Sequence, residues 1–191
     1  MNPVITWMNA THSAPVTTPF NFGVIDADDV STPYTFNIWN NRFDGAGGGT
    51  TDVSKMEDCT ITTRDMSGGL GNTVGSEIEV VKNNWFHAQV DSLGETDLAQ
   101  ESSRIGKDFT KPIGTTGTTK KDNTGATYAT PLKPGTKEIL GVKNNGVPAD
   151  AAGNYVTVTL QADVPLEAKS GQQAFKIRVN NMAPYIGNDV A

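Results

Sequence analysis

An uninterrupted alternation of side chains over residues 155–164 constrains this chain more than any other feature of its sequence. Alternation with a period of two is typical of a β-strand that buries one face. The apolar face would carry Val156, Val158, Leu160 and Ala162, and the polar face would carry Thr157, Thr159 and Gln161. A strand of this kind needs a second apolar layer against it, so the sequence predicts packed β-sheets.

Shorter alternating segments, bounded by turn residues, predict further strands along the chain. They cover residues 4–7, 15–22, 34–39, 59–64, 78–82, 85–90, 137–142 and 174–179. Asn83 and Asn84 alone separate two of them, which predicts a hairpin turn because asparagine tolerates left-handed backbone. The only helix expected is a turn or two over residues 96–104. About eight or nine short strands at this spacing predict an all-β fold, an antiparallel sandwich forming a single domain over residues 1–191.

The composition supports this fold class. The sequence has 24 Thr, 16 Asn, 20 Gly and 10 Pro. Threonine favours a pleated backbone, whereas asparagine, glycine and proline favour turns. The mixture indicates strands joined by many loops.

Residues 106–136 break the pattern of short strands and loops. Gly, Thr, Lys, Asn and Pro dominate this segment, and its large apolar residues are Phe109, Ile113, Tyr128 and Leu132. A connection this long is usually functional or disordered. We expect an ordered loop or arm inserted in the domain, shaped as a hairpin that lies on a neighbouring molecule. The alternative is a flexible loop in solvent.

The charge and the N-terminal residues exclude several classes of function. A net charge of −6 argues against nucleic acid as the main partner, because phosphates are neutralised by clustered Lys and Arg. No apolar run approaches the roughly 20 residues that span a bilayer, which argues against a membrane partner. Residues 1–4 lack the basic start and apolar stretch of a secretory signal, so we expect synthesis in a cytoplasm.

Few residues suggest catalysis or metal binding. His12 lies in a polar turn and His87 in the middle of a predicted strand, and neither has a partner at ligand spacing. Cys59 is the only cysteine, and alternation puts it on the same face as Ile61, so we expect a buried, inert thiol. The sequence predicts no enzyme activity, no catalytic or metal site and no cofactor.

Three other motifs have plain structural interpretations. The acidic run 26–29 lacks the alternating ligands of an EF-hand loop, and the glycine-rich run 45–49 lacks the Lys-Ser/Thr of a phosphate loop. Asn9-Ala10-Thr11 matches a glycosylation sequon, which has no meaning without secretion. Trp7, Trp39 and Trp85 leave an alternative open, in which they form a stacking platform for sugars.

Two stretches resemble immunoglobulin-like sandwich domains. They are Phe20-Asn21-Phe22-Gly23-Val24-Ile25-Asp26-Ala27 followed by Tyr34-Thr35-Phe36-Asn37-Ile38-Trp39-Asn40-Asn41, and the pair of predicted strands from Val156 to Val179. The first stretch and the Asn-, Thr- and Gly-rich style also resemble small structural proteins of tailed-bacteriophage virions.

This resemblance implies a non-enzymatic structural component of a phage particle. Its partners would be other virion proteins of the capsid, neck or tail, and copies of the chain itself in a homo-oligomer. The alternative is a carbohydrate-binding or adhesion module of a phage tail or cell surface. The resemblance implies no catalytic residue.

Overall fold

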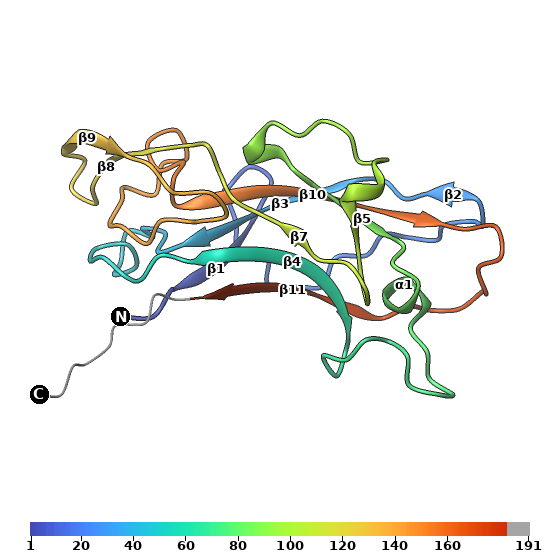
Figure 1. Ribbon diagram of the computed structural model, residues 1–191. Helices are drawn as coiled ribbons and strands as arrows, with labels where there is room; N and C mark the ends of the chain where they lie inside the picture. The colour runs from blue at the N-terminus through green and yellow to red at the C-terminus, as the bar shows by residue number, and fades with distance from the viewer. Residues whose placement is uncertain (183–191) are drawn as a thin grey trace, which may run out of the picture.

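The computed structural model describes residues 1–182 as two antiparallel β-sheets packed face to face, with a separate hairpin at one end (Figure 1). The predicted all-β class and sandwich are confirmed. The strands are β1 (Ile5–Asn9), β2 (Asp29–Val30), β3 (Tyr34–Asn40), β4 (Glu57–Asp65), β5 (Phe86–Val90), β6 (Arg104–Ile105), β7 (Lys111–Pro112), β8 (Thr119–Lys121), β9 (Thr127–Leu132), β10 (Tyr155–Val164) and β11 (Phe175–Met182).

The larger sheet has the order β1-β3-β10-β5-β6, and β2 pairs with the end of β10. The alternating segment that dominates the sequence is therefore its central strand. Val158 of β10 is opposite Phe36 of β3 on one side and Val90 of β5 on the other. This register puts apolar side chains of three neighbouring strands on one face, where they meet the second sheet.

The smaller sheet has the order β11-β4-β7. Cys59 and Ile61 of β4 are fully buried against the larger sheet, as alternation predicted. On β11, Phe175, Ile177 and Val179 are half-buried and face the core, whereas Lys176 and Arg178 are exposed. Among residues 1–182, β11 has a strand on one side only, so its other side is an open sheet edge in the part of the chain that the structure describes.

Four predicted elements differ in the structure. Residues 78–82 were expected as a strand, but Glu79–Lys82 form the short helix α1, so the expected hairpin at residues 83–84 is wrong. Residues 15–22 are extended but make only one isolated bridge, and residues 137–142 likewise make one bridge to Met56. The expected helix over residues 96–104 is reduced to a 3₁₀ turn, Glu101–Ser103.

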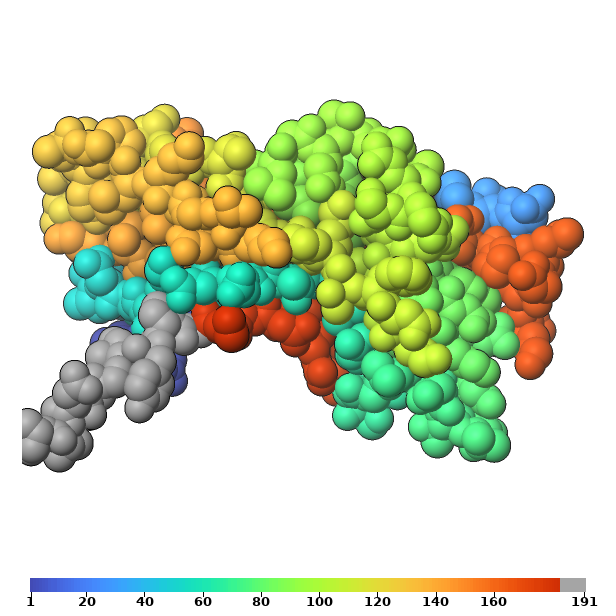
Figure 2. Space-filling view, in the orientation of Figure 1, coloured from blue at the N-terminus to red at the C-terminus, as the bar shows by residue number. Residues whose placement is uncertain are grey.

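The long segment 106–136 lies against its own chain over much of its length. Ile113 is fully buried in the main core, and Thr119 is also fully buried. Only the part from β8 to β9 forms a hairpin, and the hydroxyl of Tyr128 donates a 2.8 Å hydrogen bond to the carbonyl of Lys143. The expected contact of this arm with a neighbouring molecule stays a prediction. In Figure 2 this hairpin and the segment around residue 143 form one block, yellow to orange.

The helical segments within residues 1–182 are short, and none is long and apolar enough to cross a membrane.

Candidate binding groove

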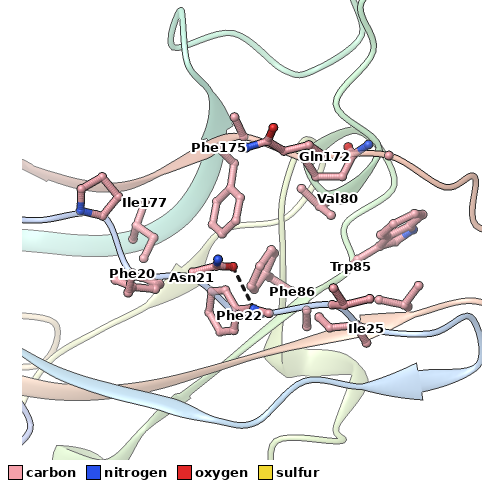
Figure 3. Close-up of a pocket in the computed structure, with 18 of the residues that line it drawn as sticks. Phe20, Asn21, Phe22, Ile25, Val80, Trp85, Phe86, Gln172, Phe175 and Ile177 are labelled. Carbon is pink, nitrogen blue, oxygen red and sulfur yellow. Dashed lines mark hydrogen bonds between the residues drawn. The ribbon is translucent and has the colours of Figure 1, made fainter.

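A cavity of about 1360 Å³ opens between residues 16–27 on one side and residues 168–177 on the other (Figure 3). Its floor is formed by Val80, Trp85 and Phe86, and by Ala162 and Val164 at the end of β10. Small-molecule sites usually measure roughly 300–1,000 Å³. The cavity exceeds that range and follows two extended segments, so we describe it as a groove.

Aromatic side chains from three distant parts of the chain meet inside the groove. The ring of Phe22 lies 5.1 Å from Phe86 and 6.2 Å from Phe175, measured between centroids. Phe86 and Phe175 are 4.5 Å apart. Phe20 extends the cluster by stacking on Tyr34 at 4.0 Å. These contacts hold the 16–27 segment against both sheets through side chains.

The main chain of residues 17–27 forms no hydrogen bond with another main-chain group in the described part of the molecule. Val16 donates to Trp7 before this stretch, and Asp28 donates to Val164 after it. Within it, the amide of Gly23 donates to the side chain of Asn21 at 2.8 Å. Gly23 has φ +82°, a conformation that glycine adopts easily, and it interrupts the alternation. This wall of the groove is an extended segment that belongs to no sheet.

The opposite wall is the open edge of β11, and the register shows which groups face it. The amide of Cys59 donates to Lys137 and its carbonyl accepts from Ile113, so odd-numbered residues of β4 bond away from β11. In an antiparallel sheet, the main-chain groups of successive residues point to opposite neighbouring strands. The main-chain groups of Thr60, Thr62 and Arg64 therefore bond with β11. Their partners are Asn180, Arg178 and Lys176. The amides and carbonyls of Phe175, Ile177 and Val179 therefore point to the open edge.

The outer face of β11 and β4 is positively charged beside this edge. Lys176 is directly opposite Arg64, and Arg178 is the next outward residue on β11. None of the three has a carboxylate within 4.0 Å among the described residues. The pKa of Arg64 is lowered first by burial and then by the charge of Arg178. The whole chain has a net charge of −6, so the three basic residues Lys176, Arg178 and Arg64 form a positively charged patch on a negatively charged protein.

Two of the three carboxylates of β4 are already engaged. Asp65 accepts hydrogen bonds from the amides of Ser67, Gly69 and Gly71, and Glu57 pairs with Lys55 at 2.6 Å. Asp58 lies on the outer face, toward the Met182 end of the sheet. Among residues 1–182, the basic group therefore has no carboxylate at ion-pair distance, and the charge of Asp65 only partly offsets the lowering of the Arg64 pKa.

The lining of the groove is mostly apolar. Its lining contains no His, Cys or Glu, and its ionisable side chains are Asp26, Lys169 and Lys176. General acid–base or nucleophilic chemistry needs a nucleophile and a base within hydrogen-bond reach of each other. The groove instead combines apolar walls, main-chain groups at an open sheet edge and a flanking positive charge.

The two histidines considered in the sequence lie far apart and have structural contacts. The indole nitrogen of Trp39 donates to Nδ1 of His12 at 3.0 Å. His87 is buried, and its Nδ1 lies 3.2 Å from the carbonyl of Gln100. Burial is the main cause that lowers the pKa of both histidines.

The remaining sequence candidates are separate from one another. Cys59 is buried, which confirms the expected position, and its pKa is raised to about 12 by burial first. Residues 26–29 are exposed, with a turn at residues 27–28 that leads into β2. Within residues 1–182, no group of three or more His, Cys, Asp or Glu is placed to hold a metal ion. In the glycine-rich run, the amides of residues 46–48 all donate to the carboxylate of Asp44.

The three tryptophans form no common surface. Trp39 is fully buried in a small cluster with Met8 and Ala151, on the side of the larger sheet away from the main core. Trp85 is 6% exposed on the floor of the groove, and Trp7 is half-buried beside Phe36.

The sequence did not indicate the groove as a site. Residues 15–22 and 174–179 were both predicted as strands, and each carries alternating apolar residues. Nothing in that pattern shows that the two segments lie on opposite sides of an open space. The available signal was Gly23, which directly follows the first segment and is a residue type that allows the chain to bend.

Comparisons with protein-family models, curated proteins and solved structures give no match to this chain.

Proposed function

We propose that this chain is a non-enzymatic structural component of a tailed-phage particle. It attaches to capsid, neck or tail proteins through surface contacts and associates with further copies of itself. It is made in the host cytoplasm and resides in the virion. Its sandwich is of the immunoglobulin-like type, and the groove supplies one of its contact surfaces.

The groove beside the open edge of β11 is the observation that supports this proposal. Phe22 and Phe175 line it on opposite walls, and Ile177 directs its main-chain groups to the edge. Open edges and apolar grooves are contact features in protein assemblies, because a partner removes both from water. Residues 20–27, part of the stretch that resembles virion proteins, form one wall of the groove. The other wall is β11, part of the stretch that resembles immunoglobulin-like sandwich domains.

The glycan-binding alternative has less support. A sugar platform needs an exposed aromatic ring, and Trp39 and Trp85 are 0% and 6% exposed. Trp7 is half-buried and packs on Phe36 with a ring separation of 5.3 Å. Exposed aromatic area is therefore small at all three positions.

Quantitative mass spectrometry of phage particles, banded from a strain that carries this gene, tests the proposal. We expect a fixed, high copy number per particle, and the number would separate capsid decoration from neck or tail. Free protein in the lysate together with its absence from banded particles would overturn the proposal.

Matched variants connect particle incorporation to the groove. Phe22→Ala removes a half-buried ring that touches both Phe86 and Phe175. We expect a several-fold lower copy number per particle, because the groove loses contact area. Val147→Ala removes an exposed apolar side chain elsewhere and should leave the copy number unchanged. Circular dichroism would confirm that both variants are folded.

A further inference from the structure

The open edge of β11 has the geometry to accept one more strand. Residues 175, 177 and 179 present amides and carbonyls at every second position, which is the spacing that an antiparallel or parallel partner strand uses. Within residues 1–182 these groups have no main-chain partner outside the ladder with β4. The groove lies beside them, so a strand added here would bury its inward side chains against Phe175 and Phe22 (Figure 3).

The charges indicate which strand fits. Side chains on the inward face of an added strand would enter an apolar groove, so they should be apolar. Side chains on the outward face would lie beside Lys176 and Arg178, which lack internal counter-charges. Cross-strand pairs of opposite charge stabilise a sheet, and like charges destabilise it.

The same charges disfavour a second copy of β11 as the occupant. In a symmetric antiparallel pair centred on Ile177, Lys176 of one copy would face Arg178 of the other. In a pair centred on Arg178, the two guanidinium groups would face each other. Both registers oppose like charges directly across the new ladder, which is a known defence of sheet edges against self-pairing.

We propose that the groove and the β11 edge accept an extended segment of another protein in which apolar residues alternate with acidic residues. The segment adds a fourth strand to the sheet β11-β4-β7. Its apolar side chains fill the groove, and its carboxylates pair with Lys176 and Arg178. This partner chemistry rests on the proposed structural role, since it describes how that contact is made.

A capped, fluorescein-labelled heptapeptide that alternates glutamate with valine and phenylalanine is a suitable probe, with the full-length chain as receptor. We expect saturable binding by fluorescence anisotropy, weakened at high salt. A peptide with lysine in place of every glutamate should bind at least about tenfold more weakly, because it places like charges beside β11. Equal binding of the two peptides would overturn the proposed charge complementarity.

Two further reagents test strand addition itself. The acidic peptide with N-methylated amides at the positions that face β11 keeps its side chains but loses its donors, so binding should be lost. Unchanged binding of this peptide would overturn strand addition. Hydrogen exchange provides a direct readout, because the amides of Ile177 and Val179 should become protected only with the unmethylated peptide.

Charge reversal provides the matched protein variants. The double variant Lys176→Glu, Arg178→Glu should reverse the preference and bind the lysine peptide more tightly than the glutamate peptide. Lys120→Glu, Lys133→Glu makes the same charge change on exposed residues of the β8–β9 region and should retain the original preference. The same preference in both double variants would overturn the assignment to β11.

The peptide test is distinguishable from the test of the proposed function. Fixed incorporation into particles without binding of the acidic peptide would leave the structural role standing and overturn the partner chemistry. Peptide binding by a chain absent from particles would support the strand-accepting edge and overturn the virion role.

Discussion

The indole Nε1 of Trp39 donates a 3.0 Å hydrogen bond to Nδ1 of His12 across the outer face of the larger sheet. The same imidazole packs edge-on against Tyr155 at 4.6 Å. A tryptophan and a histidine that sequence motifs present as possible site residues are thus partners in a structural contact. The bond requires a free electron pair on Nδ1, so it exists only while that nitrogen is unprotonated.

This contact predicts an acid-sensitive stability. Burial and Arg42 hold the pKa of His12 below its ordinary value of 6.5 in the folded chain. The unfolded chain therefore binds the proton first, and stability is full above about pH 6.5 and falls as the pH drops below it. His87 contributes in the same direction, since its pKa is also lowered.

Two variants at His12 separate the hydrogen bond from the titration. His12→Asn keeps a carbonyl acceptor and a residue that tolerates the positive φ of 58°, so its stability should vary less between pH 8 and pH 5.5 than that of the wild type. His12→Ala loses the acceptor and should cost about 1–3 kcal/mol at pH 8. Urea unfolding at both pH values measures the free energy of unfolding of the wild type and of each variant. An unchanged pH dependence in His12→Asn would contradict the role of His12.

Asn154 should be among the most sensitive polar residues of the fold. Its amide donates to the carbonyls of Asn40 and Val142, its side-chain oxygen accepts from Thr119, and it is fully buried. Asn154→Ala leaves these groups without partners, each at a cost of about 1–3 kcal/mol. We expect a total loss of about 3 kcal/mol or more in chemical unfolding. Asn180→Ala, at an exposed position, should cost less than about 0.5 kcal/mol.

The thiol of Cys59 should be inert in the folded chain. Its side chain is 0% exposed and its pKa is raised to about 12, first by burial and then by neighbouring carboxylates. Thiolate is the reactive form, so an aromatic disulfide reagent at pH 8 should label the native chain only on the timescale of unfolding. Labelling should be rapid and complete in denaturant. Fast labelling of the native chain would contradict this burial.

Asp65 predicts a second, lower acid transition. The hydroxyl of Ser67 and the amides of residues 67, 69 and 71 donate to its carboxylate, and they lower its pKa from 3.8 to about 2. Stability that depends on Asp65 is therefore full above about pH 4 and is lost as the pH falls toward 2. The loss between these values should be absent in Asp65→Asn and reduced in Ser67→Ala. Acid unfolding followed by circular dichroism measures the difference.

The alternating segments were sufficient to predict most strands from the sequence. Residues 34–39, 59–64, 85–90 and 155–164 all fall within or beside observed strands, because a period of two is compatible with one buried sheet face and with little else. The buried position of Cys59 followed from the same pattern. The all-β class thus depends on local chemistry that each segment carries by itself.

Short apolar segments were ambiguous without tertiary contacts. Residues 78–82 alternate as a strand would, yet Val80 and Val81 are both buried in α1, against β4 and the floor of the groove. Asn84 has the left-handed backbone that the sequence indicated, but it follows a helix instead of joining two strands. In each case the neighbouring layer, and not the segment, determines which side chains are covered.

The asparagines show the same division between sequence and structure. The composition indicated that asparagines favour turns, and Asn41, which follows β3, does have a positive φ of 60°. The buried amides of Asn41 and Asn144 also donate to main-chain carbonyls about 100 residues away, a role that depends on which loops meet.

The sequence by itself determined the β-strands, the inert cysteine and the lack of a motif for catalysis, because periodicity and side-chain chemistry act locally. Tertiary structure alone decided that residues 17–27 lie without main-chain partners opposite the open edge of β11. An unpaired edge is a property of strand order, and strand order arises from contacts between residues far apart in the chain.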